Sequence, residues 1–93
     1  MQFMILAYDG TDSGAPERRL RVREEHLKGA MRMYEDGSLI KGGAILDEDG
    51  EMVGSIAMVD FENRKALDAW LQSDPYVTGG VWQDITVKPI RLA

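Results

Sequence analysis

Residues 39–59, LIKGGAILDEDGEMVGSIAMV, contain two apolar segments on either side of an acidic turn. Leu39–Leu46 and Met52–Val59 have the length and apolar character of strands, and the first is interrupted by Gly42-Gly43. The turn between them contains Asp49-Gly50, and Asp-Gly is one of the stronger short-range signals for a β-hairpin. We therefore predict two antiparallel strands joined at this turn.

A helix is predicted on the N-terminal side of the hairpin, over Pro16–Glu35. Pro16 suits the first turn of a helix, and Gly37 suits its C-terminal cap. Apolar residues recur within it at helical spacing, and we expect this stripe to face the core: Leu20, Leu27, Met31 and Tyr34. A helical wheel places a polar ridge on one flank of that stripe, formed by Arg19, Arg23, His26 and Ala30.

The remaining predicted elements are a second helix and two outer strands. Asn63–Ser73 has an apolar helical face and ends before Pro75, because proline disfavours helical geometry in the residue that precedes it. Val81–Ile90 is a predicted strand with Pro89 near its end, as expected at the edge of a sheet. Phe3–Tyr8 is apolar on both alternating faces, which indicates a strand buried on both sides.

The resulting order, β-α-β-β-α-β, is that of a ferredoxin-like α+β fold: a four-stranded antiparallel sheet with two helices on one face. The 93 residues fit one domain, residues 1–93. Two helices cover only one face of this sheet, whereas Phe3–Tyr8 predicts that both faces are buried. We therefore expect a homodimer in which two sheets pack together as a dimeric α+β barrel.

Composition excludes several classes of function. A formal net charge of −5 argues against binding to nucleic acid or to an anionic membrane surface. The absence of cysteine excludes disulfide scaffolds, thiolate metal sites and cysteine nucleophiles. The first residues do not resemble a signal peptide, and no segment approaches the roughly 20 apolar residues of a membrane span. We expect a cytoplasmic protein that binds a small molecule.

His26 is the only histidine and therefore the main candidate for proton transfer near neutral pH. The alternative is an exposed histidine that contacts only water. Arg19 and Arg23 suit an anionic substrate because guanidinium groups match carboxylates, although surface ion pairs with nearby glutamates are the alternative. One histidine without cysteine gives too few ligands for a catalytic zinc ion, so no metal site is expected.

Other candidates lie further along the chain. Asp74 could accept a hydrogen bond from His26 and fix its tautomer, or it could simply end the second helix. The glycines Gly42-Gly43 and Gly54 either clear space for a ligand or allow close packing, and Ser55 would offer a hydroxyl to that space. Three aromatic residues either line an apolar pocket or fill the core: Trp70, Tyr76 and Trp82.

Two segments resemble the signatures of the YciI-like family: Arg19-Leu20-x-Val22-Arg23-x-x-His26-Leu27 and Ala69-Trp70-x-x-x-Asp74-Pro75-Tyr76. Isolated matches continue through Gly37, Leu39, Gly43, Gly54-Ser55, Gly79 or Gly80, Val81 and Val87-Lys88-Pro89. The resemblance implies a dimeric α+β barrel with a His–Asp pair at His26 and Asp74, and with Arg19, Arg23 and Ser55 nearby. Glu24 departs from the pattern, since many relatives carry proline there.

These observations predict an enzyme that needs no cofactor. His26, oriented by Asp74, would act as a general acid or base in an isomerisation or elimination of a small anionic, phenolic or lactone metabolite. Arg19, Arg23, Ser55 and Tyr76 are the candidate substrate-binding residues. A non-catalytic module that binds or senses a small ligand is the second hypothesis. A haem-binding barrel with His26 as the axial ligand is the third.

Overall fold

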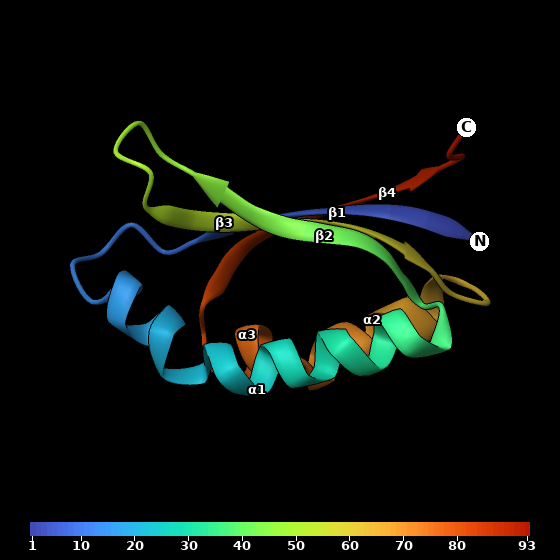
Figure 1. Ribbon diagram of the computed structural model, residues 1–93, viewed down its shortest axis with the longest axis horizontal. Coiled ribbons are helices and arrows are strands. Elements are labelled where there is room, and N and C mark those ends of the chain that lie inside the picture. Colours follow the sequence, from blue (N-terminus) through green and yellow to red (C-terminus); the bar gives the residue numbers. More distant parts are fainter.

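The computed structural model describes residues 1–93 and confirms the ferredoxin-like α+β fold (Figure 1). The elements are β1 (Gln2–Asp9), α1 (Ala15–Asp36), β2 (Leu39–Leu46), β3 (Met52–Asp60), α2 (Arg64–Ser73), α3 (Pro75–Thr78) and β4 (Trp82–Ile90). The strands form one antiparallel sheet in the order β2-β3-β1-β4. The short helix α3 was not predicted, because the turn at Asp74-Pro75 was expected only to end the preceding helix.

The helices lie on one side of the sheet, and the other face carries none (Figure 1). On the covered face, β1 contributes Phe3, Ile5 and Ala7, which are buried. The core also contains residues of the helices, the other strands and the α3–β4 connection: Met33, Leu39, Val59, Leu67, Leu71, Tyr76, Val81 and Trp82. The core is therefore a single layer between sheet and helices.

The open face of the sheet is also apolar at its centre. Met4 and Leu6 of β1 are half-buried there, and their cross-strand partners on β3 are Met58 and Ile56. β1 is therefore buried on the face that the helices cover and only half-buried on the open face, so burial on both sides is seen on one side alone. The partner sheet that this pattern suggested remains a prediction.

The predicted core stripe of α1 was wrong. Leu20, Leu27, Met31 and Tyr34 are 64%, 41%, 61% and 43% exposed. The side of α1 that meets the sheet instead carries Arg19 and Met33, which are buried, together with the half-buried His26. Because His26 and Leu27 are consecutive, the buried face lies roughly 100° around the helix from the expected one.

An ion pair makes this orientation of α1 possible. The wheel treated Arg19 as a polar residue that should avoid the core, but Asp9 at the end of β1 neutralises its charge inside the molecule. A paired and hydrogen-bonded arginine can be buried, whereas an unpaired one cannot. The ridge predicted for the border of the core therefore faces the sheet directly.

Helix ends place two further site residues. Gly37 ends α1 with a φ of 87°, a left-handed conformation that glycine adopts without steric cost. After α2, the Asp74 carboxylate caps α3 by accepting a hydrogen bond of 2.9 Å from the backbone N–H of Tyr76. Pro75 stands at the start of this helix, where its missing N–H is not needed. The cap fixes Asp74 and Tyr76 next to α1.

Candidate active site

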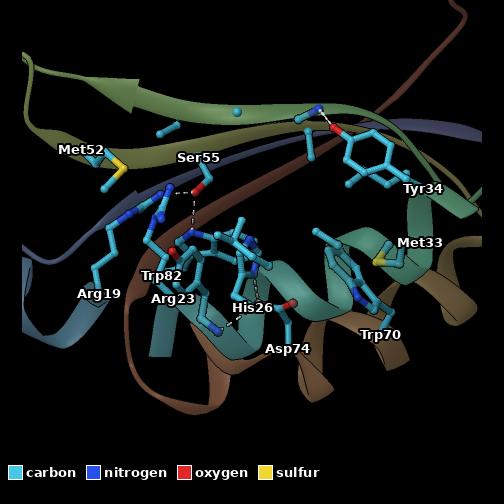
Figure 2. Close-up of a pocket in the computed structure, with 18 residues that line it drawn as sticks. Arg19, Arg23, His26, Met33, Tyr34, Met52, Ser55, Trp70, Asp74 and Trp82 are labelled. Carbon is cyan, nitrogen blue, oxygen red and sulfur yellow. Dashed lines mark hydrogen bonds and ion pairs between the residues drawn. The ribbon is translucent and has the colours of Figure 1, made fainter. Parts of the chain in front are cut away.

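His26 and Asp74 are in direct contact, although they are 48 positions apart in the sequence (Figure 2). His26 Nδ1 lies 2.8 Å from Asp74 Oδ2, and the side chain of Asp74 is only 4% exposed. The same oxygen accepts the backbone N–H of Tyr76. An ionised carboxylate can only accept, so Nδ1 carries the proton of this hydrogen bond. In the neutral imidazole, Nε2 then keeps its lone pair for a ligand.

Two aromatic rings hold the imidazole in place. Tyr76 stacks on His26 with ring centroids 3.8 Å apart and planes at 9°. Trp82 lies edge-on to the imidazole, with centroids 5.6 Å apart and planes at 76°. A hydrogen bond on one side and packing on two others leave the imidazole little rotational freedom, which is the condition for a positioned acid or base.

Arg19 forms a buried pair with Asp9 and reaches Ser55. Its Nη1 donates to both carboxylate oxygens of Asp9 at 2.9 and 3.1 Å, and its Nη2 donates to Ser55 Oγ at 3.0 Å. Trp82 Nε1 donates to the same Ser55 oxygen at 3.0 Å. Asp9 was not among the predicted site residues, because in sequence it is simply the first polar residue after an apolar strand.

Arg23 differs from Arg19 in having no partner. It is half-buried and lines the same cavity, but it makes no ion pair and no side-chain hydrogen bond within the chain. Since Asp9 already neutralises Arg19, Arg23 is the positive charge in this region that a bound anion would meet.

A cavity of about 190 Å³ connects these groups, and 11 of its 18 lining residues are hydrophobic. It lies between α1 and the covered face of β2 and β3. The polar side chains of Arg19, Arg23, Ser55 and His26 gather at one end (Figure 2). Met33, Trp70 and Tyr34 line the other end, where the Tyr34 hydroxyl accepts the backbone N–H of Gly42 at 3.1 Å. The site is therefore a mainly apolar pocket with polar groups on one side, as is usual for small-molecule ligands.

The glycines of the hairpin strands have two different functions. Gly42 and Gly43 line the cavity, as expected if the sheet clears space for a ligand. At Gly54, a Cβ atom would lie 2.5 Å from the carbonyl oxygen of Ala7 on β1, so this glycine permits close strand packing instead. Gly42 and Gly43 thus agree with the first interpretation in lining open space, and Gly54 agrees with the second in allowing close packing.

Tyr76 is almost fully buried, and burial raises the pKa of its phenol above 10.0. The charges of Arg19 and Arg23 oppose this shift without cancelling it. The Tyr76 hydroxyl makes no hydrogen bond within the chain, although the residue lines the cavity. It is consequently a neutral phenol beside the arginines.

No cluster of three or more histidine, cysteine, aspartate or glutamate side chains is arranged to hold a metal ion. None of the helices combines the length and apolar character that crossing a membrane requires.

Comparison with known sequences supplies the family. The model of the YCII-related domain matches residues 1–91. The chain belongs to this family. Protein YciI of Escherichia coli O6:H1 is 34% identical to it, in an alignment covering 98% of this chain and 97% of the relative. An uncharacterized protein of Haemophilus influenzae is 36% identical with the same coverage.

Solved structures share the fold at lower identity. A 5-chloro-2-hydroxyhydroquinone dehydrochlorinase from Burkholderia phenoliruptrix, in complex with 2,5-dihydroxybenzoquinone, matches with a TM-score of 0.86 and 20% identity. That match covers 100% of this chain and 96% of the dehydrochlorinase. A dimeric ferredoxin-like protein of unknown function from Jannaschia sp. CCS1 matches with a TM-score of 0.53 and 14% identity, over 98% of each chain. At these identities the likeness extends to the fold alone.

Proposed function

We propose that this YCII-related protein is a small-molecule enzyme in which His26, held by Asp74, transfers a proton to or from a substrate with a single ring. The observation that carries the proposal is the 2.8 Å contact between His26 Nδ1 and Asp74 Oδ2 on the wall of the cavity. A carboxylate that accepts from Nδ1 stabilises the imidazolium formed when Nε2 takes a proton. The pair is therefore suited to general acid–base catalysis.

The chemistry needs only the substrate and these side chains. Nε2 takes a proton from an acidic carbon or a phenolic hydroxyl, and the electron pair of the broken bond moves into the ring. In an elimination, the leaving group departs with its own electron pair. In an isomerisation, the same nitrogen returns the proton to another ring atom. Negative charge develops on a ring oxygen, and cationic or hydrogen-bonding groups that meet it lower the barrier.

Each predicted binding residue has a distinct part in this proposal. Arg23 supplies the uncompensated positive charge for the developing anion. Ser55 supplies a hydroxyl, and Arg19 acts through Ser55 because its own charge is already paired with Asp9. Tyr76 supports the imidazole by stacking and presents a neutral hydroxyl near the arginines.

Cavity size and charge limit the substrate. An apolar cavity of about 150 Å³ holds one benzene molecule, so about 190 Å³ suits one ring with a few substituents. The largely apolar lining favours the faces of a ring, and Arg23 favours an anionic oxygen. A hydroxylated quinone or a small lactone fits these limits. The hydroxylated benzoquinone bound by the dehydrochlorinase of similar fold supports the size argument. A haem macrocycle, with four pyrrole rings, is far larger than this cavity.

The first experiment is a substrate screen with hydroxylated and chlorinated hydroquinones and small lactones. Turnover is followed by ultraviolet absorbance and, for chlorinated compounds, by chloride release. We expect His26→Ala to abolish turnover of any active compound. Leu20→Ala, at an exposed position of the same helix that does not line the cavity, should retain it, and both variants should stay folded. Full activity in His26→Ala would contradict the proposed catalytic role of His26. Thermal stabilisation of the wild type by these compounds without turnover would favour the binding module instead.

A homodimer is the second proposal, and it depends on the open face of the sheet. Met4, Leu6, Ile56 and Met58 form an apolar centre on a face that no helix covers. An identical sheet would bury this centre symmetrically. Light scattering after gel filtration should give twice the chain mass of 10.4 kDa, and a stable monomer at micromolar concentration would exclude the dimer.

A further inference from the structure

The hydrogen bonds around Ser55 fix the direction of its hydroxyl. Ser55 Oγ receives one hydrogen bond from Arg19 Nη2 and another from Trp82 Nε1, each at 3.0 Å. A serine oxygen has two lone pairs and one proton, and guanidinium and indole N–H groups can only donate. Both lone pairs are therefore occupied, and the proton cannot point at either neighbour.

No group of the chain accepts this remaining proton. Ser55 lines the cavity and is 8% exposed, so its hydroxyl is not simply a surface group in water. A buried donor without an acceptor is costly, and a ligand oxygen that accepts from it regains that free energy. We propose that Ser55 is an obligate hydrogen-bond donor to a ligand oxygen, and that Arg19 and Trp82 enforce this polarity.

This inference deepens the proposed function by specifying the ligand chemistry. The group at Ser55 must accept, which favours a phenolate, enolate or quinone oxygen and disfavours an N–H group. The donor is also stronger than an ordinary serine, because the guanidinium that binds its oxygen polarises the O–H bond. Arg23, the unpaired cation lining the same cavity, favours the ionised form of that oxygen.

Trp82 links this donor to the proposed base. Its indole N–H reaches Ser55, and its ring lies edge-on to His26. The donor for the anionic oxygen and the group that moves the proton therefore both contact one indole. A single ring can meet both, with its oxygen at Ser55 and the proton that is transferred at His26.

Three nitrobenzenes that differ only at the para position test this polarity without a known substrate. At that position 4-nitrophenolate carries an anionic acceptor oxygen, 4-nitroaniline carries N–H donors in nearly the same shape, and nitrobenzene carries only hydrogen. The nitro group is a weak acceptor that all three share. Binding is measured by absorbance or calorimetry at a pH where the phenol is ionised. For the wild type, we expect 4-nitrophenolate to bind about 10- to 100-fold more tightly than 4-nitroaniline, as a hydrogen bond to a charged group suggests.

Variants separate Ser55 from the other groups. Ser55→Ala should remove a clear part of this preference, leaving the part that Arg23 provides, while nitrobenzene binding stays the same. Ser55→Thr should restore it because the hydroxyl is kept. Trp82→Phe frees one lone pair of Ser55, so the preference should fall as 4-nitroaniline gains affinity. Ser13→Ala, in the exposed loop before α1, is the matched control and should change nothing.

The result is independent of catalysis. His26→Ala should keep the preference for 4-nitrophenolate. A wild type that shows this anion selectivity but no turnover in the substrate screen would contradict the proposed function but not the role of Ser55. The inference is overturned if the wild type shows no preference, or if Ser55→Ala keeps it. It is also overturned if Ser55→Ala weakens the binding of all three probes equally, because that result indicates general damage to the pocket.

Discussion

Two neighbouring arginines on α1 make the same kind of ion pair in opposite surroundings. Arg18 donates two hydrogen bonds to Asp12, at 2.7 and 3.1 Å, and Arg19 donates two to Asp9, at 2.9 and 3.1 Å. The Asp12 side chain is 55% exposed, whereas those of Arg19 and Asp9 are 5% and 4% exposed. The distances are similar, although Arg18 uses both terminal nitrogens and Arg19 uses only Nη1. The main contrast between the two pairs is therefore their burial.

The exposed pair tethers a loop, and the buried pair organises the site. Water competes for Arg18 and Asp12 and screens their attraction, so such a pair adds little stability. Arg19 and Asp9 lost their hydration on folding, so each needs the other. Arg19 can consequently stand on the covered side of α1 and direct an N–H group at Ser55. The predictions below test this contrast.

Breaking the buried pair should give the largest effect. Asp9→Asn leaves Arg19 charged and uncompensated, and we expect it to lower the free energy of unfolding by about 3–5 kcal/mol. Asp12→Asn is the matched control and should change the unfolding midpoint little. Urea denaturation followed by circular dichroism measures both. Adding Arg19→Met to Asp9→Asn should recover part of the loss, since the buried charge is then gone. Equal effects of the two single substitutions would show that burial is not the cause.

His26 and Asp74 form a third pair, in which the carboxylate is buried as in Asp9. For this pair the expected effect is on activity. Asp74→Asn removes the negative charge that stabilises the imidazolium. Because Oδ2 serves both His26 Nδ1 and the Tyr76 cap, an amide NH2 in its place would donate to Nδ1, shift the imidazole proton to Nε2 and give up the cap. We expect turnover to fall about 100-fold or more, with the fold retained. Nitrogen NMR of the single histidine should show the Nδ1–H tautomer in the wild type and loss of it in the variant. The exposed Asp84→Asn provides the control.

The same contrast explains which features the sequence could predict. The order of strands and helices follows from local signals, such as the Asp49-Gly50 turn and the Gly37 cap, and these were correct within a few residues. The orientation of α1 was predicted wrongly, because a helical wheel considers the polarity of each side chain without its partners on other elements. That Arg19 turns inward depends on Asp9, which lies on another element, and no local pattern shows that the two meet.

The candidate site divides in the same way. Resemblance to a family, together with the single histidine, predicted that His26 and Asp74 belong together, and they are in contact. Asp9 carried no such signal. Trp82 was named only as a pocket or core residue, and its hydrogen bond to Ser55 depends on tertiary packing across three elements. The sequence therefore could not predict which groups of the site donate hydrogen bonds and which accept them.

An unpaired arginine should matter for binding more than for stability. Arg23→Gln removes the positive charge that no carboxylate of the chain compensates, and we expect binding of 4-nitrophenolate to weaken about tenfold. Arg21→Gln, on the same helix, removes a charge that faces solvent beside Glu17 and should leave binding nearly unchanged. Calorimetry measures both variants. Similar losses in the two would mean that general charge, and not position in the cavity, attracts the anion.

The stability of the protein at alkaline pH should depend on Tyr76, a buried group that is neutral at lower pH. Burial raises the pKa of Tyr76, so the folded protein retains a proton that the unfolded chain releases near pH 10. Stability should then fall as the pH rises from about 10 toward the higher pKa of the folded state. Urea midpoints at pH 9 and pH 11 should differ less in Tyr76→Phe than in the wild type. Tyr8→Phe, at an exposed position without a side-chain hydrogen bond, is the control and should show the same pH dependence as the wild type.

Acid should reveal the smallest effect, in the exposed pair. The hydrogen bond from Arg18 is the main cause that lowers the pKa of Asp12 below 3.8. The stabilisation from this pair is complete above the unfolded pKa and is lost as the pH falls through the lower folded pKa. Because Asp12 is exposed, protonation should loosen the loop before α1 without unfolding the domain. Backbone NMR below pH 4 should show changes around Asp12 and Gly14, absent in Asp12→Asn, while the signals of Ser55 and Trp82 remain. If the Ser55 and Trp82 signals shift together with those of the loop, the surface pair and the buried pair are coupled and do not act separately.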